Sequence, residues 1–199
     1  PEYGETRDGF EQTVGVCHVG HFLLVKTLLP VLLMAPAPRV VMVSSEAHRT
    51  PSRLNFTALP YPKDKFSTMK AYGQAKLCNA LMAVELHRRF AGQGLTACYL
   101  HPGTMVTTDI GRDSALVRLA MRLVRPFTKT ANQGAATSVF CATWGERQEL
   151  GGHYFSHCAK AKPSAETADE EAGRRLWELS EQWLKERQRI GRDLPASLD

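Results

Sequence analysis

The sequence predicts an α/β fold in which helices alternate with parallel strands. Continuous β-branched or apolar runs at 39–45 and 95–100 are typical of strands that are buried on both faces. Segments with helical periodicity lie before, between and after these runs, so the strands must be joined by crossovers and run parallel. Ligands of such sheets bind at the carboxyl ends of the strands, which here hold Ser44, Ser45 and residues 101–108.

Length and composition are those of one globular domain. The chain has 199 residues, of which 43% are hydrophobic and 23% are charged, and this composition excludes a disordered protein. No internal repeat or low-complexity tract is present. Five cysteines without a C-x-x-C motif argue against a disulfide framework and for a reducing compartment. We therefore expect residues 1–199 to form a single domain.

Net charge and hydropathy argue against a nucleic-acid partner and against a membrane span. The net charge is +5, but Lys and Arg are scattered among 20 acidic residues and no nucleic-acid-binding module is present. We therefore expect no nucleic-acid partner. The longest apolar segment, 22–35, is interrupted by Lys26 and Pro30 and is shorter than the roughly 18 residues of a membrane span. We expect neither a membrane span nor a signal peptide.

The expected elements follow from periodicity and from helix start and stop signals. A helical pattern begins at Phe10 and ends before the Ala-Pro-Ala-Pro segment. The residues on its apolar side are Val14, His21, Val25, Leu28, Leu29 and Leu32. The other expected elements are a mostly irregular segment at 46–66, a long helix at 69–91 stopped by Gly92 and Gly94, helices at 114–125 and 131–143, a strand at 151–155, and a final helix opened by a capping box of Thr167 and Glu170.

The most informative group is Tyr72-Gly73-Gln74-Ala75-Lys76, at the start of the long helix. The i, i+4 spacing places the Tyr72 ring and the Lys76 ammonium on one helix face, about 5–6 Å apart at Cβ. A nearby cation and the positive end of a helix favour the phenolate form of a tyrosine. Such a tyrosine could pass a proton to or from a substrate oxygen near neutral pH. Tyr and Lys also occur at this spacing on many surface helices, so the motif gains weight only from its neighbours.

Two further polar groups are expected at the same sheet edge. Ser45 ends the strand that precedes the helix, and its hydroxyl could donate to the same substrate oxygen. The next strand ends in a Pro-Gly turn at 102–103, followed by Thr104, Met105 and Thr107. Three polar groups that converge on one edge predict a site better than any one of them does.

Together these residues resemble the short-chain dehydrogenase/reductase family, and in particular its retinol-dehydrogenase-like branch. The matching motifs extend over nearly the whole chain: Thr6-Arg7-Asp8-Gly9-Phe10-Glu11, His18-Val19-Gly20-His21-Phe22, Val43-Ser44-Ser45, Tyr72 to Lys76 with Leu77-Cys78-Asn79, His101-Pro102-Gly103, Pro126-Phe127-Thr128-Lys129 and Gln133-Gly134-Ala135-Ala136. The resemblance implies a Rossmann-type, doubly wound parallel sheet. It also implies hydride transfer between a nicotinamide cofactor and an alcohol or carbonyl carbon.

The resemblance further implies a role for each site residue. Tyr72 corresponds to the catalytic acid/base, and Lys76 corresponds to the lysine that holds the nicotinamide ribose and promotes ionisation of the tyrosine. Ser45 corresponds to the serine that polarises the substrate carbonyl. The residues implied to contact the nicotinamide end of the cofactor are Tyr72, Lys76, Pro102, Gly103, Thr104, Met105 and Thr107. No metal site is implied.

The chain departs from the family pattern in two ways. Cys17 stands where the family has the Asn that holds a water in a proton relay, and a thiol is a poor donor and acceptor. The glycine-rich phosphate loop and the Asn-Asn-Ala-Gly motif are absent, and residue 1 is Pro. We therefore expect the C-terminal part of the fold only, without the first βαβαβ half. Residues 92–97 fit G-x-G-x-x-A but follow a helix and precede a strand, so we expect a helix stop there.

Cofactor, substrate and partners follow from the same resemblance. It implies NADP(H) or NAD(H), with a slight preference for NADP(H), and a substrate lid at 104–130 whose apolar side suits a lipophilic alcohol or carbonyl. The segment 112–129 is also basic and amphipathic, so the alternative to a lid is peripheral contact with an anionic membrane. The helix 69–91 lies where relatives dimerise, so a homodimer is expected. The expected location is the cytoplasm or a cytosol-facing membrane surface, with any targeting segment upstream.

Other functions have weaker support. Because half of the expected cofactor site is missing, the chain could be a non-catalytic interaction or scaffold protein on the same fold. Ser45 with His48 could indicate a hydrolase, but the G-x-S-x-G nucleophile elbow is missing. His153, His157 and Cys158 have the residue types of metal ligands but no acidic partner on the same strand face, so we expect no metal.

Overall fold

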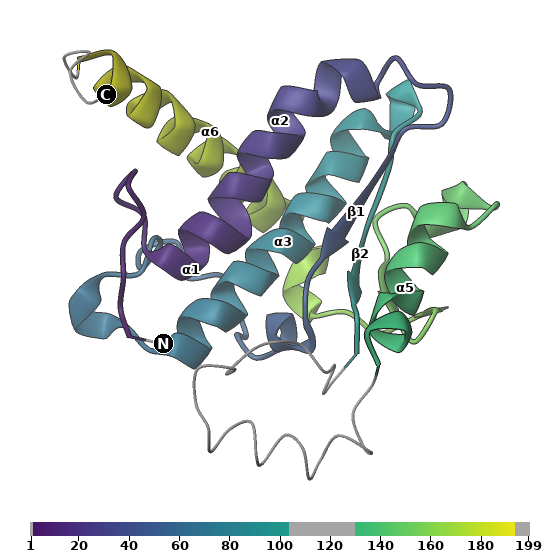
Figure 1. Cartoon of the computed structure of the whole chain (residues 1–199), viewed down its shortest axis with the longest axis horizontal. Coiled ribbons are helices and arrows are strands. Elements are labelled where there is room, and N and C mark those ends of the chain that lie inside the picture. Colours follow the sequence, from purple (N-terminus) through teal and green to yellow (C-terminus); the bar gives the residue numbers. More distant parts are fainter. Residues whose placement is uncertain (1, 104–129, 194–199) are drawn as a thin grey trace, which may run out of the picture.

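A mostly parallel sheet lies at the centre of the protein. The computed structural model describes residues 2–103 and 130–193 (Figure 1). The strands follow the order β1-β2-β3-β4 and are β1 (Arg39–Val43), β2 (Thr96–His101), β3 (Tyr154–Ser156) and β4 (Ala159–Lys160). The first three strands are parallel, and β4 pairs antiparallel with β3. The predicted α/β fold is confirmed. The bounds of the expected strand at 151–155 are wrong, because Gly152 turns the chain with a φ of 71° and β3 begins only at Tyr154. The sequence did not indicate the antiparallel strand β4.

The register of β1 and β2 defines the edge at which a site is expected. Val43 pairs with Leu100, and the backbone N–H of Ser44 donates to the Leu100 carbonyl at 2.8 Å. Every residue of β2 is buried, as expected for a strand covered by helices on both faces. The residues that follow β1 and those that follow β2 therefore emerge side by side.

The long helix α3 (Thr68–Phe90) covers one face of β1 and β2. Its apolar side chains, such as Leu77 and Leu86, are completely buried. The helix continues into the short 3-10 turn η4 (Ala91–Gln93) and stops at Gly94. The φ angle of 86° at Gly94 lies in the left-handed region that favours glycine. The predicted bounds of 69–91 agree with this helix to within one residue, and the predicted helix stop at residues 92–97 is confirmed.

The N-terminal helical segment packs against α3 and consists of α1 (Gln12–Val14), the π-helical turn η1 (Gly15–Val19) and α2 (Gly20–Leu32). Glu11 caps it, because its carboxylate accepts hydrogen bonds from the first free backbone N–H groups. Val14 and Val25 are buried as predicted, but His21 and Leu28 are exposed. The predicted apolar face is wrong at these two positions because the π-helical turn shifts the phase of the residues after it.

The same segment corrects the expectation about membrane-spanning length. By length and composition alone, the run Gln12–Leu32 could cross a membrane. The expectation that no apolar segment is long enough to span a membrane is wrong, because the helix begins at Gln12, ten residues before the apolar segment 22–35. A core helix of a soluble protein has the same length and hydropathy, and one side of this run, including Phe22, is buried.

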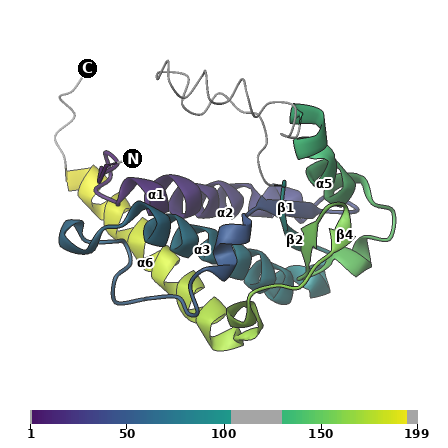
Figure 2. The same ribbon diagram turned by 90° about the horizontal axis from the view of Figure 1, so that it is seen from below.

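Helices cover both faces of the sheet, as a doubly wound arrangement requires. Helices α2, α3 and α6 (Glu170–Asp193) lie on one side of β1 and β2, whereas α5 (Ala131–Thr143) lies on the other side (Figures 1 and 2). The helix α5 has the predicted bounds and a complete capping box between Thr130 and Gln133.

The start of α6 differs from the prediction. The expected capping box of Thr167 and Glu170 is wrong, because Thr167 lies in the 3-10 turn η7 (Ala165–Ala168) and its hydroxyl donates to the Ser164 carbonyl. Asp169 takes its place, since its carboxylate accepts from the backbone N–H of Ala172 at 3.1 Å. The choice between two neighbouring capping residues is therefore decided by the packing of η7.

A buried histidine connects the N-terminal helical segment to α6. The Ser180 hydroxyl donates to the Leu176 carbonyl, so it accepts a hydrogen bond from His18 Nε2 at 2.9 Å. Both side chains are completely buried. Burial lowers the pKa of His18 to about 4, and the charge of His21 lowers it further, whereas Asn79 has the opposite effect. His18 is therefore neutral in the folded protein at neutral pH.

This depressed pKa predicts how stability depends on pH. Between pH 6.5 and about 4, the unfolded chain binds a proton at His18 that the folded protein does not bind. The free energy of unfolding is therefore expected to fall as the pH falls through this range, by about 3 kcal/mol from His18.

Urea unfolding followed by circular dichroism at several pH values measures this dependence. His18→Leu should flatten the slope between pH 6.5 and 4, whereas His21→Gln, at an exposed position on the same segment, should keep most of it. Equal slopes in the wild type and in His18→Leu would contradict the assignment.

Candidate active site at the carboxyl edge of the sheet

The end of β1 is tied directly to α3. The hydroxyl of Ser44 donates to the Lys76 carbonyl at 2.8 Å. Lys76 returns toward the strand, because its Nζ donates to the carbonyl of Val43 at 3.2 Å. Two hydrogen bonds between neighbouring residues thus hold one position of the helix on the last residues of the strand. The sequence places Ser44 at the strand end but does not indicate this contact, because the partner residue is 32 positions away.

Tyr72 and Lys76 lie on the same face of α3 at this edge. The Lys76 Nζ is 5.6 Å from the centroid of the Tyr72 ring, which confirms the geometry that the i, i+4 spacing predicts. Both side chains are half-buried, so their polar ends remain accessible to a ligand. The ammonium has three donors and uses one on the Val43 carbonyl.

Ser45 follows in an extended conformation and is also half-buried. Its hydroxyl oxygen accepts from the backbone N–H of Ala47 at 3.2 Å, which leaves its proton available to donate. This bond begins the short 3-10 helix η2 (Glu46–Arg49). Ser45 therefore combines a fixed backbone with a free O–H donor at the end of β1.

His48 holds the backbone of Ser45. Its Nδ1 donates to the Ser45 carbonyl at 2.6 Å, and its Nε2 accepts from the backbone N–H of Ser164 at 3.3 Å. Burial lowers the pKa of His48, so the neutral ring that these two bonds require is favoured. His48 contacts the carbonyl of Ser45 and not its hydroxyl, which removes the geometric basis for a Ser–His hydrolase pair.

Glu46 adds a charged contact at the same edge that the sequence did not indicate. The Tyr154 hydroxyl donates to the Glu46 carboxylate. Arg49 forms an ion pair with the same carboxylate, with 3.2 Å between Arg49 Nη1 and Glu46 Oε2. Burial opposes ionisation of Glu46, but the hydrogen bond from Tyr154 and the charge of Arg49 outweigh it and lower its pKa. Burial and this bond together raise the pKa of Tyr154. The pair joins η2 to β3.

Gly73 allows the segment after Ser45 to approach α3. A Cβ atom at Gly73 would lie 3.2 Å from the Ala47 carbonyl oxygen and 3.3 Å from Pro51 Cδ. The absence of a side chain directly after Tyr72 therefore lets η2 and the following residues pack against the helix. This packing sets the position of Ser45 relative to Tyr72.

The end of β2 contributes Pro102 and Gly103 to the same edge. Gly103 is buried and has a φ of 115°, in the left-handed region that favours glycine. Thr104, Met105 and Thr107, with the expected helix at 114–125, lie outside the described residues, as does all of the expected lid except Thr130. The structure thus places the Pro-Gly turn beside the end of β1.

Cys17 lies in η1 and is half-buried. It packs against a core cluster that includes Ala71 and Ala75 of α3, the residues directly before Tyr72 and Lys76. Within the described ranges, no group of three His, Cys, Asp or Glu side chains is arranged to hold a metal ion.

Comparisons with known proteins identify relatives over most of the chain. No protein-family model matches it. The chain is 45% identical to WW domain-containing oxidoreductase from Danio rerio and 44% identical to the same protein from Homo sapiens, each over 188 residues, or 92% of this chain. It is 42% identical to retinol dehydrogenase 11 from Homo sapiens over 178 residues, or 89% of this chain. These alignments cover 46%, 45% and 55% of the relatives, so the chain spans about half of their length.

A solved structure supports the fold. A crystal structure of an uncharacterized protein from Mycobacterium paratuberculosis superimposes with a TM-score of 0.70 and 32% sequence identity, and the match covers 93% of this chain and 63% of that one. With the sequence relatives, it places the chain in the short-chain dehydrogenase/reductase family, as part of a Rossmann-type fold. Within that family the chain belongs to the retinol-dehydrogenase-like branch.

The role of Gly73 can be tested by stability. Gly73→Val would force side-chain atoms against the Ala47 carbonyl and Pro51, so the free energy of unfolding should fall by about 1–3 kcal/mol. The matched control is Gly92→Val, because an added Cβ at Gly92 meets no atom within 4 Å. Urea unfolding gives the free energy of unfolding of both variants. An equal decrease at the two positions would show that the close approach of Ala47 and Pro51 to Gly73 does not contribute to stability.

Proposed function

We propose that this chain supplies the catalytic residues of an NAD(P)-dependent oxidoreductase that interconverts an alcohol and a carbonyl compound. The observation that carries the proposal is the position of Lys76, whose ammonium lies beside the Tyr72 ring and is anchored to the last carbonyl of β1. Named oxidoreductases and retinol dehydrogenases among the relatives support the same class of reaction.

The residues present fit the nicotinamide end of such a cofactor. Lys76 has two donors left for ribose hydroxyls after its bond to Val43, and the Pro102–Gly103 turn lies at the neighbouring strand end. NAD(H) or NADP(H), when bound, accepts or supplies the hydride. NADP(H) is preferred on the family resemblance. The sequence contains no glycine-rich phosphate loop between a strand and a helix.

The chain's own residues would handle the proton and orient the substrate. In alcohol oxidation, the Tyr72 phenolate would accept the hydroxyl proton while the carbon that bears this hydroxyl loses a hydride to the oxidised cofactor. In carbonyl reduction, the Tyr72 phenol would give its proton to the substrate oxygen. The free O–H of Ser45 donates to the substrate oxygen and holds it beside Tyr72. The Lys76 ammonium lies beside the Tyr72 ring.

The substrate and partners belong to the same proposal. A lipophilic alcohol or carbonyl, peripheral membrane contact through 112–129 and a cytosol-facing location rest on the family resemblance and on segments outside the described residues. A homodimer remains a proposal as well. Most of α3 is buried, whereas α2 exposes Leu24, Leu28 and Val31, so a dimer involving this layer would use α2.

The acid/base role of Tyr72 predicts a large loss of activity on removal of one oxygen atom. In the full-length product of the gene, Tyr72→Phe should lower kcat by about 10²–10⁴-fold, the usual contribution of a positioned proton-transfer group. The control Tyr3→Phe should leave kcat unchanged. Hydride transfer is followed by NAD(P)H absorbance, with circular dichroism to confirm folding. Undiminished turnover of Tyr72→Phe would contradict the proposal, and a wild type without any hydride transfer would favour a non-catalytic scaffold.

Replacement of Cys17 by asparagine is expected to raise activity. Because an amide donates and accepts hydrogen bonds far better than a thiol, Cys17→Asn should raise kcat by about 10-fold through an improved proton relay. Cys158→Asn, at an exposed position, is the matched control. The pH dependence of kcat for the three proteins provides the measurement, and a lower kcat for Cys17→Asn would show that the relay does not pass this position.

A further inference from the structure

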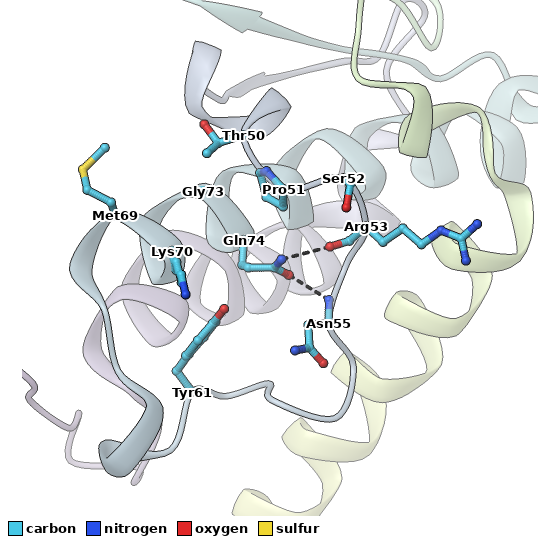
Figure 3. A pocket seen from close by; sticks show the side chains of 10 residues that line it. All are labelled: Thr50, Pro51, Ser52, Arg53, Asn55, Tyr61, Met69, Lys70, Gly73 and Gln74. Atoms are coloured by element: carbon cyan, nitrogen blue, oxygen red, sulfur yellow. Dashed lines mark hydrogen bonds between the residues drawn. The ribbon is translucent and has the colours of Figure 1, made fainter.

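A pocket of about 400 Å³ lies on α3 next to the candidate active site, and its lining does not include Ser45, Tyr72 or Lys76. It is lined by the segment after η2 and by the first turns of α3, including Pro51, Asn55, Tyr61, Met69, Lys70 and Gln74 (Figure 3). Its volume is within the range of small-molecule sites. The close packing of Ala47 and Pro51 on Gly73 separates it from Ser45 and Tyr72.

The wall of this pocket is held in place by Gln74. The Gln74 side-chain oxygen accepts from the backbone N–H of Asn55 at 2.9 Å, and its amide nitrogen donates to the Arg53 carbonyl at 2.9 Å. Figure 3 shows both bonds reaching from the helix to the loop. Gln74 is 6% exposed, so both ends of its amide are used to shape the pocket and neither is spare for a ligand.

The remaining polar groups are mainly donors. Lys70 forms no hydrogen bond or ion pair with any other residue in the described ranges, and Figure 3 shows its ammonium pointing toward the Tyr61 hydroxyl. Tyr61 is 7% exposed, and burial raises its pKa, so its hydroxyl keeps its proton. Arg53 contributes its backbone carbonyl, which Gln74 binds, while its side chain points away from Lys70 and Tyr61 (Figure 3). Lys70 therefore supplies the positive charge, and the lining contains no carboxylate.

The start of α3 strengthens this positive character. The first turn of the 23-residue helix contains no acidic residue, and the Ser67 side chain makes no capping hydrogen bond. The positive end of the helix dipole therefore lies close to Lys70 without an internal anion to offset it. Pro51 and Met69 supply apolar surface beside these donors.

We propose that this pocket is a second ligand site, which binds a small organic carboxylate with an apolar body. The carboxylate would lie between the Lys70 ammonium and the Tyr61 hydroxyl, and the apolar body would lie against Pro51 and Met69. The site is independent of the proposed redox chemistry, because its lining does not include Ser45, Tyr72 or Lys76. A measurement of ligand binding therefore tests this site without a measurement of enzymatic turnover.

Octanoate is a suitable probe, and octan-1-ol is its uncharged match. Titrated into the whole 199-residue chain, octanoate should shift the backbone amide resonances of 50–55 and 69–74 in a saturable way. Octan-1-ol should bind at least about fivefold more weakly, because it lacks the charge that Lys70 recognises.

Two variants and one control complete the test. Lys70→Gln should weaken octanoate binding by about fivefold, and Tyr61→Phe by about two- to threefold. Lys65→Gln removes an exposed lysine outside the lining and should leave the affinity unchanged. Equal affinity for octanoate and octan-1-ol, equal effects of Lys70→Gln and Lys65→Gln, or shifts concentrated on the exposed apolar side of α2 would each overturn the proposal.

Discussion

The attachment of Lys76 to the end of β1 is the constraint on which the candidate site depends. The carbonyl of Lys76 accepts from the Ser44 hydroxyl, and its ammonium donates to the Val43 carbonyl. These two bonds fix both the height and the rotation of α3 relative to the strand. They thereby place the Tyr72 ring, one helical turn earlier, at the carboxyl edge of the sheet.

The surrounding structure keeps a second element at the same edge. Gly73 removes the side chain that would block the segment after Ser45, and His48 holds the Ser45 carbonyl while itself bound to the Ser164 N–H. Neither residue offers chemistry of its own, yet together they define where the Ser45 hydroxyl lies. The pocket at Gln74 is formed by the same approach of loop and helix.

Elements that depend on local periodicity could be predicted from the sequence, whereas those that depend on distant partners could not. The two apolar runs, the long helix and the shared face of Tyr72 and Lys76 follow from neighbours along the chain, and the structure confirms them. The cap of α6, the π-helical turn and the bond of His48 to Ser164, 116 positions away, depend on packing. The catalytic roles come from the family resemblance.

A crystal structure of the full-length gene product with NADP(H) bound would test the central claim most directly. The account predicts that the Lys76 ammonium lies within hydrogen-bonding distance of the nicotinamide ribose hydroxyls while keeping its bond to the Val43 carbonyl. The Tyr72 hydroxyl should face the nicotinamide beside Ser45. A nicotinamide ring bound away from this edge, with Lys76 and Tyr72 turned to solvent, would contradict the account.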